Sequence, residues 1–352
     1  MEKSNIKVDY SNYIGTAVYN INAMYTDKQN KTKILYFTYL QKGKSVDDFK
    51  KQINKIWGNI DHEFMNKQIA KLQELVHSDN VKLAVDIGRL KGIETYKIGS
   101  QEWIINDEFF KLLPESDFNK IEQKYMDRVI KDYSKKKKTI DKEEIDTDTY
   151  LEERLKTYDE DINQIVAYYN KENQIQRYVQ VSSYLSMLHN VDLTRSGWNQ
   201  TMADADRLKA NTFIIPYHPF SCIDCQQYQN QPLSRRYVEQ VLGIEATEQV
   251  GDILHPNCKC TLSILWDDSQ IEMDLPSTEE QAENYQVRQR VNSITLQQSK
   301  LETDLILANK LGNQSLVDKI NSKLAKLESQ KQKMVNSLPT KSLRIQVEAI
   351  NR

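Results

Sequence analysis

The chain has 352 residues, and its 48 basic and 50 acidic side chains leave a formal net charge of -2. This balance excludes a global attraction to nucleic acid or acidic membranes, although a local basic face stays open. Only 10 Gly and 7 Pro are present, which favours long helices over a strand-rich fold. No stretch approaches the roughly 20 consecutive apolar residues of a membrane span. The first residues lack a basic-then-apolar leader, so we expect a chain made and used in a reducing cytoplasm.

The N-terminal region, residues 1–133, is predicted to be helical. Its segment KILYFTYL (33–40) fits either a short strand or a buried helical turn. Ser45 and the acid three residues later form an N-cap pattern, after which apolar residues recur at the spacing of an amphipathic helix. A second helical tract is predicted for residues 117–133.

A polar segment follows at residues 134–149, with the sequence SKKKKTIDKEEIDTDT. Its basic run is followed directly by an acidic run, so the two fields cancel and a phosphate-binding patch is disfavoured. We therefore predict a solvated linker or exposed hinge at this position.

The next region, residues 150–270, begins with helical patterning that continues to about Ala210. The segments NTFIIPYH (211–218) and CTLSILW (260–266) are short, β-branched and aromatic, and each predicts a strand. If the two strands pair, the cysteine-bearing segments next to them come together.

All four cysteines lie in this part of the chain. Cys222 and Cys225 form a C-x-x-C knuckle, and Cys258 and Cys260 close an H-P-N-C-K-C segment that contains His255. Thiolates at C-x-x-C spacing lie on one side of a turn, and tetrahedral zinc needs four ligands from these five candidates. We predict a structural zinc site made by the four cysteines, or with His255 in place of one of them. Two disulfides, or thiols without metal, remain the alternative.

The C-terminal region, residues 271–352, carries the clearest helical pattern. Ser277 and Glu280 form a capping box, apolar residues follow at heptad spacing, and Gly312 marks the end of the first helix. A second helix follows and is expected to end near Pro339. Two helices joined by a short turn predict an antiparallel helical hairpin, which we expect to dock onto a partner.

The sequence lacks the motifs of several enzyme classes. A zinc deaminase needs H-x-E ahead of P-C-x-x-C, and no H-x-E precedes the knuckle. An HNH-type nuclease needs a further His beside the metal, a thioredoxin-like site needs a βαβ context, and Gly-rich phosphate loops are missing. His77 and His189 are isolated in the sequence and are interpreted as structural residues. We therefore expect no catalytic residues and no enzymatic activity.

The segments TRSGWNQTMADADR, CIDCQQYQNQPL and LHPNCKCTL, in this order, resemble the F-like minor head proteins of Mu-type phages. These belong to the wider family of phage head morphogenesis, or minor capsid, proteins. The closing H-P-x-C-x-C of that family is matched by His255, Pro256, Cys258 and Cys260. The resemblance covers roughly residues 190–270 well and the tail loosely. PFS before the first knuckle and YQNQP after it depart from the family pattern.

The resemblance implies a structural protein of a tailed phage head that associates with the portal during head assembly. The implied partners are the portal protein and the major capsid or scaffolding protein. Packaged DNA is a further candidate partner, and no membrane is involved. The implied location is inside the virion head near the portal, after assembly in the host cytoplasm, and some family members leave the head with the DNA.

The combined expectation is a mainly α fold with a small α/β zinc-braced minor head module at 150–270 and a C-terminal helical hairpin. A zinc-bearing adaptor is the alternative binding function. Related domains have been linked to the ADP-ribosyltransferase fold, so a phage-borne effector enzyme, either a nuclease or an ADP-ribosyltransferase, is the alternative catalytic function.

Overall fold

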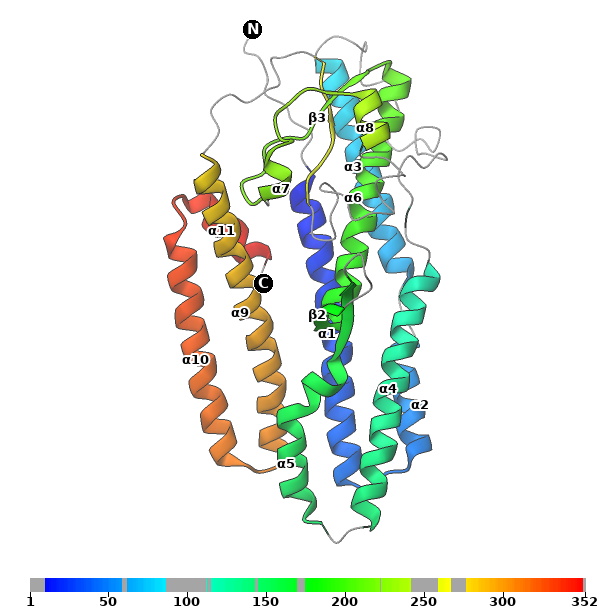
Figure 1. Cartoon of the computed structure of the whole chain (residues 1–352), viewed down its shortest axis with the longest axis vertical. Helices are drawn as coiled ribbons and strands as arrows, with labels where there is room; N and C mark the ends of the chain where they lie inside the picture. The colour runs from blue at the N-terminus through cyan, green and yellow to red at the C-terminus, as the bar shows by residue number, and fades with distance from the viewer. Residues whose placement is uncertain are drawn as a thin grey trace. The chain divides into compact units, whose positions relative to one another are not determined.

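The architecture is mainly helical with a small amount of antiparallel β-structure (Figure 1). This confirms the coarse fold class expected from the sequence. Among the residues that the structure describes, no helix is both long enough and apolar enough to cross a bilayer. The computed structural model describes residues 10–58, 62–86, 112, 115–142, 145–169, 175–221, 223–241, 259–266 and 277–350.

The chain folds into two compact units, each assembled from three separate segments. Unit 1 comprises Met1–Tyr19, His62–Leu113 and Met187–Arg288. Unit 2 comprises Asn20–Asp61, Pro114–Ser186 and Gln289–Arg352. The sequence suggested four regions, each a single contiguous range of residues, and the boundaries of these regions stay a prediction.

Unit 1 combines helices with a three-stranded antiparallel sheet of order β4-β3-β5. Its core is formed by α6 and the sheet, with Trp198 and Phe213 among the side chains that are fully buried. Its strands are β3 (Thr212–Ile214), β4 (Leu233–Ser234) and β5 (Ser263–Ile264). Its helices are the start of α1 (Ser11–Gln41), α3 (His62–Asp86), most of α6 (Val181–Leu208), α7 (Ile223–Gln226), α8 (Arg235–Val241) and the start of α9 (Thr278–Lys310).

One close approach in unit 1 requires a glycine. A Cβ atom placed on Gly197 of α6 would lie 2.4 Å from a ring carbon of Tyr10, well inside contact distance. The Tyr10 ring is buried, and its hydroxyl accepts a hydrogen bond from the backbone N–H of Leu262 at 3.2 Å. The missing side chain at position 197 therefore lets the Tyr10 ring lie against α6 and reach the segment that leads into β5.

Unit 2 contains the rest of α1 and α9 together with shorter helices and one hairpin. Helix α5 ends in a π-helical turn, η2, and the chain then forms the antiparallel pair β1–β2. The remaining elements are α2 (Val46–Trp57), α4 (Glu115–Lys142), α5 (Thr147–Tyr158), η2 (Asp159–Asn163), β1 (Gln164–Tyr169), β2 (Ile175–Gln180), α10 (Gln314–Ser337) and α11 (Lys341–Ile350).

The core of unit 2 is rich in aromatic rings from α1, α2, α4 and α5. Phe49 stacks on Tyr133 with 3.9 Å between ring centroids, and Tyr36 meets the edge of Tyr158 at 4.9 Å. Two of these hydroxyls have acceptors: Tyr36 donates to Asp132 at 2.6 Å, and Tyr133 donates to the backbone carbonyl of Lys44 at 2.8 Å. Ring pairs of this kind add about 0.5–1.5 kcal/mol beyond the burial of their area. These contacts join helices that are far apart in the sequence.

The first part of the segment 134–149 is helical, because α4 continues to Lys142, and the role of the segment as a linker stays a prediction. Lysine is a good helix former when its charge is solvated. Lys137 also forms an ion pair with Asp141 one turn later, at 2.7 Å. The segment 33–40, for which a strand or a helical turn was open, belongs to α1.

The helical patterning expected after Tyr150 is interrupted by the hairpin β1–β2. Gln164 pairs with Gln180, and the ladder continues toward Tyr169 and Ile175. The strands IVAYY and IQRYV are β-branched and aromatic, which is the composition that favours a pleated surface over a helix. Local strand preference therefore prevails over the longer helical period in this segment.

The two helices predicted in the tail are present and lie side by side in opposite directions (Figure 1). Ser277 accepts the N–H of Glu280 at 3.2 Å, as the capping box requires. Gly312 has φ +70°, the left-handed conformation that glycine adopts readily at a helix end. Asn313 then caps α10 by accepting the N–H of Leu316 at 2.9 Å. The helices pack through Ala308, Leu301, Leu305, Leu316, Val317, Ile320 and Leu324.

Candidate functional site

The structure describes two of the five predicted metal ligands. Cys225 lies in α7 and Cys260 precedes β5, and both are buried, with 2% and 3% of the residue exposed. Both belong to the same hydrophobic core of unit 1. The other three candidates, Cys222, His255 and Cys258, lie outside the described residues.

Strand pairing is what brings the two cysteine-bearing segments into one core. Phe213 of β3 pairs with Ile264 of β5, and Ile214 pairs with Ser263, in an antiparallel register. The sequence predicted strands at these positions, and their pairing is confirmed. Because Cys225 follows β3 and Cys260 precedes β5, the ladder brings these two cysteines into the same core.

Side chains of helix α6 donate hydrogen bonds to the backbone of the segment around Cys260. The indole N–H of Trp198 donates to the carbonyl of Cys260 at 3.0 Å, and the Thr201 hydroxyl donates to the carbonyl of Leu262 at 3.0 Å. All four residues are buried. The segment of the motif is thus positioned by two hydrogen bonds from one helix, a role that the sequence pattern alone did not indicate for Trp198.

Two cationic side chains accompany the same segment. Arg288 is buried, with 4% exposed, and its guanidinium lies over the ring of Phe220 at 5.5 Å. Burial lowers the pKa of Arg288 to about 10. Burial also lowers the pKa of Lys259, and the positive charge of Arg288 acts in the same direction. Within the described part of the chain, no carboxylate forms an ion pair with either group. Buried cations usually need a negative partner, and thiolates could supply it.

His218, four residues before the knuckle, has a structural role in the described part of the chain. Its ring is buried, and Nδ1 accepts the backbone N–H of Phe220 at 3.0 Å. Gln229 lies close by and directs its amide toward the sulfur of Cys260 at 3.9 Å. Among the described residues, no group of three or more His, Cys, Asp and Glu side chains is placed to hold a metal ion.

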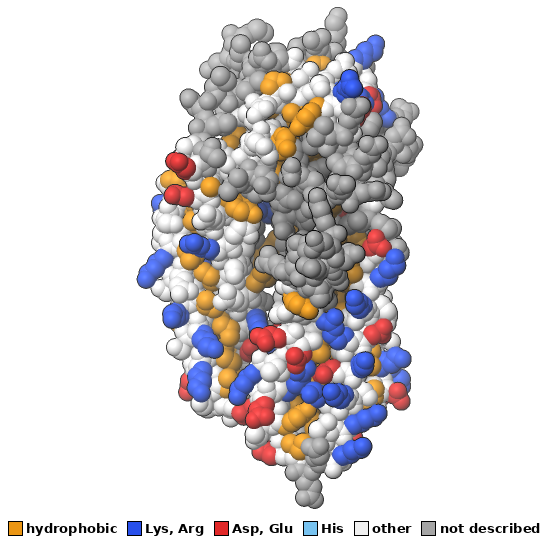
Figure 2. Space-filling model, viewed as in Figure 1, with side chains coloured by type: hydrophobic (Ala, Val, Ile, Leu, Met, Phe, Trp, Pro, Cys, Tyr) orange, Lys and Arg blue, Asp and Glu red, His pale blue; other side chains and the backbone are white. Residues whose placement is uncertain are grey.

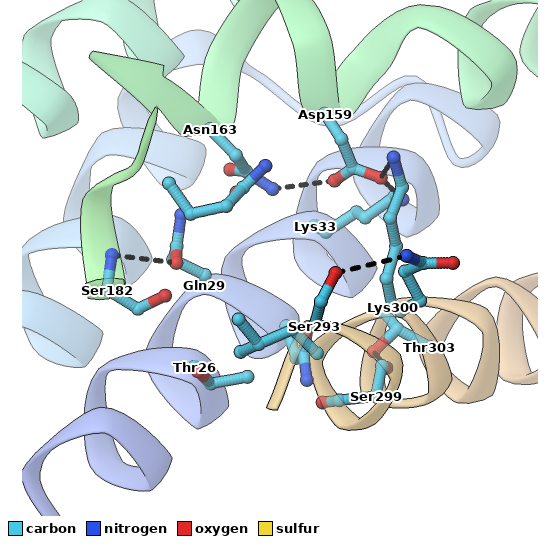
Figure 3. A pocket seen from close by; sticks show the side chains of 14 residues that line it. Thr26, Gln29, Lys33, Asp159, Asn163, Ser182, Ser293, Ser299, Lys300 and Thr303 are labelled. Atoms are coloured by element: carbon cyan, nitrogen blue, oxygen red, sulfur yellow. Dashed lines mark hydrogen bonds and ion pairs between the residues drawn. The ribbon is translucent and has the colours of Figure 1, made fainter. Parts of the chain in front are cut away.

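A separate polar cavity of about 210 Å³ lies within unit 2 (Figure 3). Figure 3 shows Lys33, Lys300 and Asp159 directed toward one another at one side of it. On the other side, the side-chain amide oxygen of Gln29 accepts a hydrogen bond from the backbone N–H of Ser182 at 3.1 Å. The wall is formed by Thr26, Gln29, Asn30, Lys33, Asp159, Asn163, Gln180, Ser182, Ser293, Leu296, Gln297, Ser299, Lys300 and Thr303.

The charges beside this cavity cancel in a buried network. Lys33 donates to Asp159 at 2.7 Å and to Asp304 at 2.6 Å, while Lys300 reaches Asp159 at 3.2 Å. Burial alone would raise the pKa of Asp159, but Lys33 and Lys300 lower it below its usual range. Burial raises the pKa of Asp304, and Lys33 opposes that shift. The cavity therefore offers hydroxyl and amide groups, and the charges of its wall residues Lys33, Lys300 and Asp159 are balanced only when Asp304, which lies outside the wall, is included.

A second buried polar cluster lies in unit 1 around Asp204. Its carboxylate is bonded to His77 Nδ1, Asn80 and Gln200, each at 2.9 Å, and all four residues are buried. His189 is also buried, and burial lowers its pKa to about 4, so its ring is neutral at pH 7. The interpretation of both histidines as structural residues stays a prediction. No pattern in the sequence indicated that His77 and Asp204 meet, since they are on different helices.

Comparison with protein families, with curated proteins and with solved structures found no match for this chain.

Proposed function

We propose that this chain is a structural minor head protein of a tailed phage, which associates with the portal while the head is assembled. The observation that supports this most is the pairing of β3 with β5. It accompanies the burial in one core of Cys225 and Cys260, which belong to the C-x-x-C and the H-P-x-C-x-C motif respectively. These motifs carry the resemblance to the minor head family. The finer description of residues 150–270 as a minor head module is part of the same proposal.

The proposal includes structural zinc bound by the four cysteines, or by three of them and His255. Zinc would supply folding free energy to the module by crosslinking the two motif halves. Its support is chemical: two of the candidate thiols are buried together, and a thiolate cluster is anionic. Such a cluster would compensate the positive charge of the buried Arg288 and the half-buried Lys259, for which the described residues provide no carboxylate.

Metal content tests the zinc proposal directly. The full chain is purified under reducing conditions, and zinc is measured by elemental analysis together with the number of free thiols. We expect one zinc per chain, four protected thiols, and release of metal with gain of thiol reactivity on chelation. Cys225→Ser should lower the zinc content, whereas Ser221→Ala, a neighbouring buried control, should not. Zinc-free protein with four reactive thiols, or with bridged cysteines in non-reducing mass spectrometry, contradicts it.

Association with the portal tests the structural role. The chain carrying an affinity tag is produced in cells that assemble the phage, and heads are isolated. We expect the portal to co-purify with the chain, the major capsid or scaffolding protein to appear in assembly intermediates, and the chain to be present in finished virions. Absence from virions, with no portal in the purified material, overturns the proposed function.

The proposal also says that the chain is not an enzyme and has no catalytic residues. Purified protein should therefore neither hydrolyse NAD nor nick supercoiled DNA. Either activity would favour the effector alternative, an ADP-ribosyltransferase-like or nuclease function. A zinc-loaded chain that binds a partner outside the phage head would favour the adaptor alternative.

A further inference from the structure

Helix α4 carries a row of exposed lysines that is interrupted once, by the exposed Asp127. They are separated by four, seven, four, three and four residues, so they share one face of the helix. The row extends over about 33 Å at 1.5 Å per residue. Its members are Lys120, Lys124, Lys131, Lys135, Lys138 and Lys142, and each is exposed.

The acids of α4 do not neutralise most of this row, because the tertiary structure uses them elsewhere. Glu122 is buried and accepts a hydrogen bond from Tyr25 at 2.8 Å. Asp132 accepts from Tyr36 and pairs with Arg154. Among the described acids beside the row, Asp127 and Asp141 are exposed and Asp117 is half-buried; Asp117 pairs with Lys120 and Asp141 with Lys137. Among the described residues of the outer face a clear excess of positive charge remains, so the cancellation expected from the sequence for residues 134–149 does not extend along the whole row; Glu143 and Glu144 lie outside the described residues.

Helix α2 packs against α4 and extends the basic surface. Lys50, Lys51 and Lys55 are exposed on it, while its acids, Asp47 and Asp48, belong to its first turn. Figure 2 shows Lys and Arg side chains gathered over this part of unit 2 with fewer acids between them. The downstream acid Asp146 caps α5 by accepting the backbone N–H of Asp148, and it also accepts from the Thr149 hydroxyl, so it is engaged locally.

We propose that the exposed α2–α4 face binds the phosphate backbone of duplex DNA without regard to its sequence. A straight row of cations matches the closely spaced charges of a duplex, and the lysines are long and solvated enough to contact phosphates. Lysines alone position a protein on the backbone, whereas sequence is read by groups that reach base edges. The exposed large apolar side chains, Tyr178, Leu296, Ile306 and Ile345, are on other elements, so the face lacks the apolar anchors of a membrane-surface helix.

This inference is argued from the α2–α4 surface alone and goes beyond the proposed role in the head. If the chain does have that role, the packaged genome would be the duplex DNA that this surface binds. Its failure would leave the portal association untouched. Conversely, a chain that binds duplex DNA but is absent from virions would refute the head role and leave this surface in place.

The test measures binding of the full chain to a labelled duplex of about 30 base pairs by fluorescence anisotropy between 50 and 200 mM salt. For the unmodified chain we expect micromolar affinity that falls steeply with salt. The triple variant Lys131→Gln, Lys135→Gln, Lys138→Gln should reduce the salt slope by about 0.9 per lysine and weaken binding roughly 100- to 500-fold at 0.1 M salt. A triple Lys→Arg variant at the same positions keeps the charge and should retain binding.

A matched control removes the same charge from another helix of unit 2. Lys319, Lys323 and Lys326 are exposed on one face of α10, and their triple Lys→Gln variant should bind duplex DNA nearly as well as the unmodified chain. Circular dichroism should show both variants folded, since all six side chains are exposed.

Three results would overturn the proposal. One is equal weakening by the α10 control, which would mean that only net charge matters. Another is binding without salt dependence. The third is binding to phosphatidylserine-containing vesicles through the same lysines with no binding to the duplex, which would assign the face to a lipid surface.

Discussion

Lys33 is a buried cation on α1 that contacts acids from two distant parts of unit 2, and its removal gives a sharp test of the packing. Its side chain is 2% exposed and lies 2.7 Å from Asp159 and 2.6 Å from Asp304. Lys33→Met keeps the length of the apolar stem and deletes only the charge. The two carboxylates would then remain in a buried site with Lys300 as the nearest remaining cation, at 3.2 Å from Asp159.

The expected loss is large because the acids cannot regain their hydration. Breaking a buried ion pair by removing one partner costs about 3–5 kcal/mol, mostly for the charge left unpaired. Lys300 is half exposed, so its ion pair with Asp159 is screened and recovers only a small part of this loss. Replacing the whole set in Lys33→Met, Asp159→Asn, Asp304→Asn should therefore restore most of the stability, since no buried charge remains unpaired.

The loss should also depend on pH with a defined sign. In the unmodified protein the pKa of Asp159 is lowered relative to the unfolded chain. The ionised carboxylate therefore stabilises the fold above its unfolded-state pKa, and this stabilisation is lost as the pH falls through its folded-state pKa. Without Lys33 both carboxyls lose a positive neighbour, and burial raises the pKa of each above that in the unfolded chain. The ionised acids then destabilise the variant at pH 7, and protonation on acidification removes that penalty. The difference between the variant and the unmodified protein should shrink from pH 7 to about pH 4.5.

Urea unfolding followed by circular dichroism at both pH values measures this, with Lys31→Met as the control. Lys31 lies two residues away and pairs with Asp27 at 2.6 Å, but both side chains are more than half exposed. An exposed pair one helical turn apart contributes only about 0.3–0.5 kcal/mol. The reasoning fails if Lys33→Met costs no more than this control, or if its cost is the same at the two pH values.

Three further substitutions test other contacts. Gly197→Ala should destabilise the protein by about 1–2 kcal/mol despite the better helix propensity of Ala, because the new methyl group displaces the Tyr10 ring; a gain in melting temperature would refute this. Asp204→Ala removes the acceptor shared by His77, Asn80 and Gln200 and should cost about 3–5 kcal/mol by urea unfolding, with a cost below about 1 kcal/mol arguing against a buried network. Asn313→Ala removes the cap of α10 and should lower stability by about 1 kcal/mol in thermal unfolding, whereas Asn313→Asp should be nearly neutral.

Local signals in the sequence were sufficient for the ends of several elements. Ser45 caps α2 and Ser277 caps α9, each through a hydrogen bond to a residue three positions later. Gly312 provides the left-handed residue at the end of α9. The strands β3 and β5 lie within the two segments chosen for their β-branched and aromatic residues. In each case the decisive contacts involve neighbours in the chain, so their free energies are visible in a short window.

The candidate site was predicted less completely. The cysteine spacing indicated which residues belong together, and strand pairing places Cys225 and Cys260 in one core. The support from Trp198 on α6, and the cations Lys259 and Arg288 near the same segment, could not be derived from spacing. These contacts arise because distant elements pack around the motif, and no local periodicity encodes them.

What the sequence by itself determined are the helical character, the caps and turns, the two strands and the clustering of cysteines, because these follow from residues that are close along the chain. Only the tertiary structure decided where buried charges find partners. Lys33 meets Asp159 and Asp304, and His77 meets Asp204, across more than a hundred residues each. It also decided the charge of the α4 surface, since packing turns Glu122 and Asp132 inward and leaves the lysines in solvent. Burial and charge pairing depend on which faces meet, and that is set by the packing of the whole unit.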